Sequence, residues 1–310
     1  MSIELSVVIP TLNREESLCA TIEHFVSRET YDRFEVIVID QTASHSAETE
    51  RYLASAASRI RLVRVDYRSL PRARNHGVRL AAGEVVVFVD DDVIPTDGFL
   101  AAHAAAYADP TIGGVTGPAV SPGAALVPMD RVPAEFWSAL ERRGAMRFDL
   151  DVAFDARWAV GCNMSFRRES ILAVGGFDER FFDVATGEDA EFSHRLIQTG
   201  ARIRYEPCAA LVHLQQPSGG CKSTAAVDRR MMNATANIVY QHSRQRPMPR
   251  HFWPTLARHF RRDVLTRRRL ATGAIVPGAW WFARGVAKGL VLGRKASVLP
   301  LLRASDVDAS

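Results

Sequence analysis

The stretch Val85-Val86-Val87-Phe88-Val89-Asp90-Asp91-Asp92 joins five apolar residues directly to three acidic ones. A short run of β-branched and aromatic side chains predicts a strand that is buried on both faces. Similar apolar runs precede it, so strands are expected at residues 5–9, 34–39, 60–65 and 84–89. Segments with helical spacing separate these runs, which indicates an α/β fold with a mostly parallel central sheet flanked by helices.

The second half of the chain is less regular. We expect one strand within residues 113–128, and others at 158–166, 203–205 and 210–214. Helices are expected at residues 168–174 and 188–198. From Asp228 onward the pattern becomes helical and increasingly basic.

The acidic triplet Asp90 to Asp92 follows its strand directly. In parallel sheets, ligands bind beyond the carboxyl ends of the strands. Because side chains alternate along an extended chain, Asp90 and Asp92 point to the same side. Two carboxylates on one side suit Mg²⁺ or Mn²⁺, and a solvated acidic turn is the alternative interpretation.

Residues 88–92, with Pro95 just beyond them, resemble the DxD segment of the family 2 glycosyltransferases, which have the Rossmann-like GT-A fold. Five further elements match that family in order, and they read VVIPTLNR (7–14), RARNHG (72–77), GCNMSFRR (161–168), GGFDE (175–179) and GED (187–189). The likeness covers roughly residues 3–215. It implies metal-dependent, inverting transfer of a sugar from a nucleotide-diphosphate donor to a hydroxyl of a glycan or lipid-linked acceptor.

The resemblance also implies donor-side roles. Asp92, assisted by Asp90, is expected to hold Mn²⁺ or Mg²⁺, with His213 as a further candidate ligand, although a lone histidine is often structural. Asp91 is expected to contact the ribose. The other expected donor contacts are Arg74 at the diphosphate and Thr11, Asn13 and Asp40 around the nucleobase. A surface arginine, and a turn or helix cap, are the alternatives for Arg74 and for Thr11 and Asn13.

One position departs from the family pattern. The family usually has two acidic residues at the end of the second strand, and here the second is Gln41. An amide both donates and accepts hydrogen bonds, so the base preference can differ from uracil.

On the acceptor side, the resemblance implies that Asp189 is the general base and that Glu188 supports it. Both carboxylates begin a predicted helix, so helix capping is the alternative. Trp158 and Asn163 are expected to border the acceptor cavity, with core packing as the alternative for Trp158.

The net charge is unevenly distributed along the chain. Residues 1–240 contain 25 Lys and Arg against 32 Asp and Glu, whereas residues 241–303 contain 14 against one. We therefore expect a catalytic domain at 1–225 (nucleotide-sugar half 1–110, acceptor half 111–225), basic amphipathic helices at 226–303 and a tail at 304–310. Basic helices with tryptophans suit an anionic membrane surface, and a solvated helix pair is the alternative.

These features predict an enzyme on the cytoplasmic, inner face of the cell membrane, bound peripherally through residues 250–295. No signal peptide or spanning segment is expected, and the four scattered cysteines indicate free thiols. No groove-reading motif supports a nucleic-acid partner. Two other functions stay open at this point: a nucleotidyltransferase acting on sugar phosphates, and a non-catalytic membrane-binding or anion-binding protein with a nucleotide fold.

Overall fold

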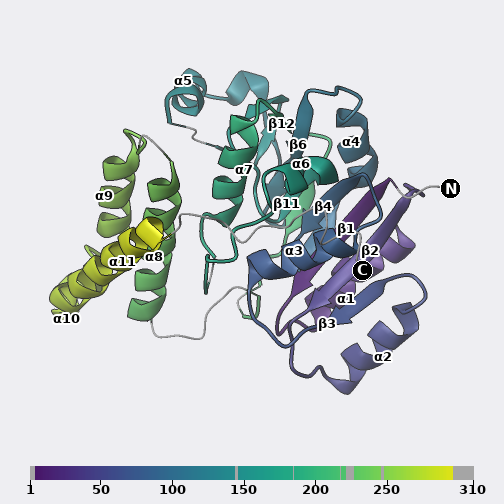
Figure 1. Cartoon of the computed structure of the whole chain (residues 1–310), viewed down its shortest axis with the longest axis horizontal. Helices are drawn as coiled ribbons and strands as arrows, with labels where there is room; N and C mark the ends of the chain where they lie inside the picture. Colours follow the sequence, from purple (N-terminus) through teal and green to yellow (C-terminus); the bar gives the residue numbers. More distant parts are fainter. Residues whose placement is uncertain are drawn as a thin grey trace.

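A central sheet of eight strands organises the molecule (Figure 1). The computed structural model describes residues 4–143, 146–183, 185–216, 218–220, 227–245 and 248–295. The strand order is β10-β12-β6-β11-β4-β1-β2-β3. The strands are β1 (Leu5–Thr11), β2 (Phe34–Asp40), β3 (Arg61–Arg64), β4 (Val85–Val89), β6 (Ile112–Thr116), β10 (Phe154–Ala156), β11 (Asn163–Arg167) and β12 (Arg202–Tyr205).

Most neighbouring strands in this sheet run parallel. The exceptions are β11, which lies antiparallel between β4 and β6, and β10, which is antiparallel to β12 at the edge. The predicted α/β fold with a mostly parallel sheet is therefore confirmed.

Alternate side chains of each strand pack into two different cores. Val86 and Phe88 of β4 face helices α3 (Leu70–Leu80), α6 (Arg168–Ala173) and α7 (Glu188–Gln198). Val85, Val87 and Val89 face α1 (Glu16–Ser27), α2 (Ala47–Ala56) and α4 (Phe99–Ala106). Since both faces of β4 are covered, its sequence is apolar at every position.

The second half differs in detail from the expectation. Gly117 and Pro118 interrupt the apolar pattern, so the single strand expected within 113–128 is three short ones: β6, β7 (Ala119–Val120) and β8 (Val127–Pro128). The strand expected at 158–166 begins only at Asn163. The pattern missed several short elements, namely α4, α5 (Ala134–Arg143), the 3₁₀ turn η1 (Met129–Arg131), β5 (Val93–Pro95) and β9 (Leu150–Asp151).

A small second sheet extends the acidic triplet. Strand β5 directly follows Asp92 and pairs antiparallel with β13 (Leu211–His213), which puts His213 opposite Val93. This pairing brings a histidine from late in the chain to the carboxyl end of β4.

Four helices follow the sheet in the described part of the chain: α8 (Val227–Arg244), α9 (Phe252–Asp263), α10 (Arg267–Thr272) and α11 (Ile275–Lys295). Helix α11 packs closely on α8 through glycines, because a Cβ at Gly289 would lie 2.5 Å from the carbonyl oxygen of Ala236. Among the described residues, no helix is long and apolar enough to cross a membrane. Cys221 and the tail expected at 304–310 lie outside the described residues.

Candidate active site

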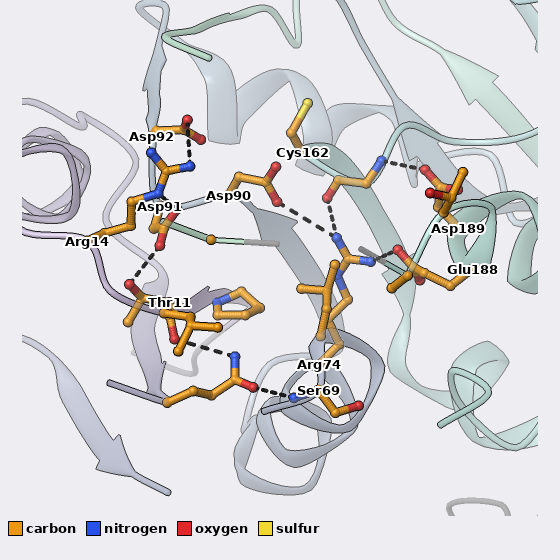
Figure 2. A pocket seen from close by; sticks show the side chains of 18 of the residues that line it. Thr11, Arg14, Ser69, Arg74, Asp90, Asp91, Asp92, Cys162, Glu188 and Asp189 are labelled. Carbon is orange, nitrogen blue, oxygen red and sulfur yellow. Dashed lines mark hydrogen bonds and ion pairs between the residues drawn. The ribbon is translucent and has the colours of Figure 1, made fainter. Parts of the chain in front are cut away.

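A cavity of about 660 Å³ opens at the carboxyl ends of β1 and β4 (Figure 2). Its walls come from the loop after β1, the start of α3, the acidic triplet, the turn before β11, and the segment that leads into α7. This volume lies within the range of small-ligand sites. The cavity therefore brings together the motifs that the sequence pattern distributes along more than 200 residues.

Asp90, Asp92 and His213 meet at one side of the cavity. Each offers a ligand atom, and these atoms lie within 4.8 Å of one another. The Nε2 atom of His213 lies 3.2 Å from Oδ1 of Asp92 and 3.9 Å from Oδ2 of Asp90. Two carboxylates and one imidazole form a donor set that suits Mn²⁺.

Asp91 points away from these ligands, as predicted, although β4 ends at Val89 and Asp91 lies in the turn that follows. Its carboxylate accepts a 2.7 Å hydrogen bond from the Thr11 hydroxyl and lies 3.5 Å from Nε of Arg14. Burial raises the pKa of Asp91 to about 7, even though Thr11 and Arg14 favour its ionised form. For Asp92, burial is outweighed by hydrogen bonds from His213 and the Gln216 amide, which lower the pKa below its ordinary value.

Arg14 is a site residue to which the sequence interpretation gave no role. Its guanidinium lies 3.2 Å from Asp92, lines the cavity and is only 7% exposed. Among the described residues, its buried Nε and Nη1 atoms have no hydrogen-bond partner. Unsatisfied buried donors are costly, so this arginine is well suited to an anionic ligand. The signal was a cation three residues after the end of a strand.

Arg74 connects the metal side of the cavity to the other side (Figure 2). This buried guanidinium from α3 bonds to Glu188, donates a 2.9 Å hydrogen bond to the Gly161 carbonyl and lies 3.8 Å from Asp90. Burial raises the pKa of Glu188 to about 7, against the attraction of Arg74. Arg74 is thus an internal bridge between carboxylates and not the surface arginine of the alternative interpretation.

Asp189 lies at the positive end of α7. Its Oδ2 accepts a hydrogen bond from the Gly161 amide at 3.1 Å, and its Oδ1 accepts one from the Ala190 amide at 2.8 Å. Burial raises the pKa of Asp189, while Arg74 and these two amides oppose that shift. The side chain lines the cavity and has the fixed orientation that a proton acceptor needs.

Three predicted site residues do not line the cavity. Asp40 is fully buried and orders the loop after β2. Its carboxylate accepts a 2.9 Å hydrogen bond from the Thr42 backbone amide and lies 3.0 Å from Nε2 of His45. Asn163 is also fully buried, and its amide donates 2.8 Å bonds to the Pro118 and Ala209 carbonyls. Trp158 packs edge-to-face on Phe148 at a ring distance of 5.0 Å. Their contacts with the nucleobase or the acceptor stay predictions, and the structure shows these three side chains bonded to or packed on other parts of the protein.

Thr11, Asn13 and Gln41 do line the cavity. The side-chain amide of Gln41 is bonded to the protein backbone. Its Oε1 accepts a 2.7 Å hydrogen bond from the Ser69 backbone amide, and its Nε2 lies 3.4 Å from the Thr11 carbonyl oxygen. Asn13 has a left-handed backbone, with φ of 52°, which an asparagine tolerates better than most residues. Gln41 therefore connects the end of β1 to Ser69 at the start of α3.

Gly161 lies between Arg74 and Asp189 and contacts both. A Cβ at this position would be 2.9 Å from Nη2 of Arg74 and 3.4 Å from Oδ2 of Asp189. We expect Gly161→Ala to displace both side chains. If the site carries out the expected sugar transfer, kcat for that reaction should fall by about 10- to 100-fold, because small displacements of reacting groups slow a reaction strongly. Steady-state kinetics on the folded variant measure this effect.

Gly98→Ala is the control for the loss of a glycine. Gly98 has a φ of 76°, and a Cβ at this position would have no neighbouring atom within 4 Å, so the change strains the backbone away from the cavity. It should lower the melting temperature and keep kcat. Parent-like kcat in Gly161→Ala would contradict the prediction.

The fold and the site together define the class of this protein. A mostly parallel sheet with an acidic metal-type site at the end of its fourth strand is the arrangement of the GT-A glycosyltransferases. A mannosyltransferase from Pyrobaculum calidifontis, solved in complex with GDP-Man and Mn²⁺, matches with a TM-score of 0.57 over 96% of this chain and 89% of that one, at 19% identity. GalNAc-T7, solved with UDP, GalNAc and Mn²⁺, matches with a TM-score of 0.58 over 79% of this chain and 51% of that one, at 17% identity. At these identities the likeness shows the fold alone.

The chain belongs to glycosyl transferase family 2, whose model matches residues 6–175. A second model, the N-terminal domain of galactosyltransferase, matches residues 144–216. The pre-mycofactocin glycosyltransferase of Mycobacterium tuberculosis is 29% identical over 213 residues, which cover 68% of this chain and 42% of that protein. The glucosyl-dolichyl phosphate glucuronosyltransferase of Haloferax volcanii is 26% identical, over 68% of this chain and 69% of that protein. The predicted family is confirmed, and the chain spans about two fifths of the length of the M. tuberculosis relative.

Proposed function

We propose that this protein transfers a sugar from a nucleotide-diphosphate donor to a hydroxyl of a glycan or lipid-linked acceptor, with inversion at the anomeric carbon. One observation carries this proposal: the Asp90, Asp92 and His213 cluster shares a single cavity with the carboxylate of Asp189. The family membership favours glycosyl transfer over nucleotidyl transfer and over a purely binding role. The relatives above support a sugar as the transferred group.

On the donor side, Asp90, Asp92 and His213 are the residues that would hold Mn²⁺ or Mg²⁺. When bound there, the cation supplies positive charge that offsets the charge developing on the leaving diphosphate. Asp91 would accept a hydrogen bond from a ribose hydroxyl, and Thr11 and Asn13, which line the cavity, would contact the nucleobase. Arg14 would donate to a phosphate oxygen through Nη1, which has no hydrogen-bond partner in the described part of the chain.

On the acceptor side, Asp189 would act as the general base. The Gly161 and Ala190 amides hold its carboxylate. The acceptor hydroxyl gives its proton to Asp189 while its oxygen bonds to the anomeric carbon. The bond from that carbon to the diphosphate oxygen breaks on the opposite side, and the nucleoside diphosphate leaves. Glu188, bonded to Arg74, would hold the base at a fixed position relative to the donor side of the cavity.

A panel of nucleotide-sugars, each tested with Mn²⁺, Mg²⁺ or a chelator, tests this function. We expect at least one donor to release its nucleoside diphosphate in a metal-dependent manner, and the same nucleoside diphosphate to raise the melting temperature. Release of pyrophosphate from a nucleoside triphosphate and a sugar phosphate would indicate a nucleotidyltransferase instead. Absence of both reactions, and of any stabilisation by nucleotides, would overturn the proposal.

We further propose peripheral binding to the anionic, cytoplasmic leaflet of the cell membrane. Helix α10 and the start of α11 form the end of the molecule farthest from the central sheet (Figure 1). Three apolar side chains are exposed there: Leu270 by 59%, Val276 by 78% and Trp280 by 53%. Exposed arginines lie nearby in the sequence, at positions 267, 268 and 284. Exposed apolar and basic side chains close together in the sequence are typical of an interfacial membrane contact.

Replacing both Val276 and Trp280 with Asp is expected to lower binding to anionic vesicles by about 10-fold or more, because each change removes an apolar anchor and adds repulsion. Sedimentation with phosphatidylglycerol vesicles measures this effect, with phosphatidylcholine vesicles as the neutral reference. Met129→Asp is a matched control, since Met129 is 54% exposed on the catalytic domain. Equal binding of the parent to both vesicle types would contradict the membrane proposal.

A further inference from the structure

Helix α8 contacts the segment that leads into the carboxylates of α7. The Tyr240 hydroxyl donates a 2.6 Å hydrogen bond to Oδ2 of Asp178. The Asn237 amide donates to the Phe182 carbonyl at 2.8 Å, and the Asn233 amide donates to the Asp183 carboxylate at 3.0 Å. Polar side chains from three positions of one helix thus hold this segment.

The packing around these bonds is close. Tyr240 forms a buried cluster with Phe181 and Ala185, against Leu70 of α3 and Leu292 of α11. At Gly187, the residue before Glu188, a Cβ would lie only 2.4 Å from Oε1 of Gln241. Helix α8 therefore contacts the chain immediately before the predicted base.

The segment adopts a backbone that it does not favour by itself. Asp183 and Ala185 have left-handed φ values of 57° and 48°, and neither is a glycine. Such residues persist only where the surrounding structure holds them. Both line the cavity, so the contacts that hold them also shape the acceptor side of the site.

We propose that α8 is a positioning element of the active site, in which Tyr240 and Asn237 fix residues 178–183 and 185–187 and thereby the orientation of Asp189. This inference rests on the proposed function. Both matched family models end by residue 216, whereas α8 begins at Val227. The region after the catalytic domain thus contributes to acceptor use, in addition to the membrane contact proposed above.

The chemistry of the Tyr240 contact supports a fixed geometry. Asp178 also bonds to the Arg180 side chain at 2.8 Å and 3.0 Å. Burial and the neighbouring Asp178 raise the pKa of Tyr240, so its hydroxyl stays protonated and remains the donor. Hydrogen bonds to a carboxylate are among the strong ones. In addition, the Lys288 ammonium of α11 lies 3.7 Å from the centre of the Phe182 ring.

Tyr240→Phe and Asn237→Ala test the proposal, because each removes one contact to the segment. We expect each to lower kcat by about 10-fold and to raise KM for the acceptor, with KM for the donor unchanged. If the segment loosens, Asp189 becomes more exposed to water, and its raised pKa falls. The acid limb of the plot of kcat against pH should therefore move to lower pH. Hydrogen exchange at the backbone amides of 178–189 should become faster, and this readout requires no turnover.

Met231→Ala is the matched control on the same helix. Met231 packs with α9 and α11, among Phe252 and Phe282, and not with the segment before α7. It should lower the melting temperature and keep kcat, the acceptor KM and the exchange at 178–189. The inference is overturned if Tyr240→Phe and Asn237→Ala keep parent kinetics and exchange, or if Met231→Ala reproduces their changes. Failure of the parent to use any nucleotide-sugar, with exchange still faster in the variants, would instead reject the proposed reaction.

Discussion

Replacing Asp189 with Asn is expected to lower kcat for sugar transfer by about 10³-fold, the usual contribution of a positioned general base. The side chain keeps its size, and its remaining oxygen can still accept from the Gly161 or Ala190 amide. An amide cannot take a proton from the acceptor hydroxyl. The affinity for the nucleoside diphosphate should therefore stay close to the parent value, which titration calorimetry measures.

The pH dependence of the parent provides a second readout of the same residue. Burial raises the pKa of Asp189, and Arg74 opposes the shift across the Gly161 backbone. Burial also raises the pKa of the neighbouring Glu188, to about 7. Since the base acts only when unprotonated, kcat should rise with pH and reach half its maximum above the ordinary value of a free aspartate. The residual rate of Asp189→Asn should lack this limb, and full turnover in the variant would show that another group is the base.

The fold was largely predictable from the first half of the chain because its strands are buried on both faces. Such strands are apolar at every position, as in residues 85–89, and the acidic triplet follows at once. Strand β11 illustrates the limit of this pattern. Its pairing between β4 and β6 is antiparallel, and nothing in its own composition distinguishes that direction. The expected start at residue 158 was wrong, since a turn at Gly161 and Cys162 interrupts the apolar stretch.

Site residues were predictable where the backbone alone sets the direction of a short side chain. Asp90 and Asp92 face the same side even though β4 ends at Val89 and Asp91 and Asp92 lie in a turn, and His213 joins them because β13 pairs with β5. Asp40 and Asn163 also end or begin strands, yet they point into the protein and satisfy backbone groups there. Sequence position does not distinguish these two outcomes, because partners such as Pro118 and Ala209 come from distant segments.

The contacts of longer side chains were the least predictable. Arg74 lies on α3 and crosses the cavity wall to Glu188, more than 100 residues later. Arg14 folds back onto Asp91 and Asp92 instead of extending into solvent. The bonds from α8 to residues 178–183 have no sequence signature either, since Tyr240, Asn237 and Asn233 are three among many polar residues of this helix.

Asp92→Asn is expected to lower kcat/KM for the donor by about 10³-fold, since charge stabilisation by a bound cation contributes several kcal/mol. The change preserves shape and removes one of the two negative charges that face His213. The bond from the Gln216 amide can persist, because an amide oxygen also accepts. The loss should therefore appear as weaker Mn²⁺-dependent donor binding, with the fold retained.

Thermal stabilisation by a nucleoside diphosphate, with and without Mn²⁺, measures this loss directly. The parent should gain stability from the pair of ligands and lose that gain with a chelator, because only binding to the folded state shifts the melting temperature. Asp97→Asn is the matched control, as Asp97 is an exposed carboxylate five residues further along that does not line the cavity. Parent-like, Mn²⁺-dependent stabilisation of Asp92→Asn would show that the cation is held elsewhere. A loss in Asp92→Asn with none in Asp97→Asn would connect the cation to the carboxyl end of β4, because Asp92 lies there together with Asp90 and His213.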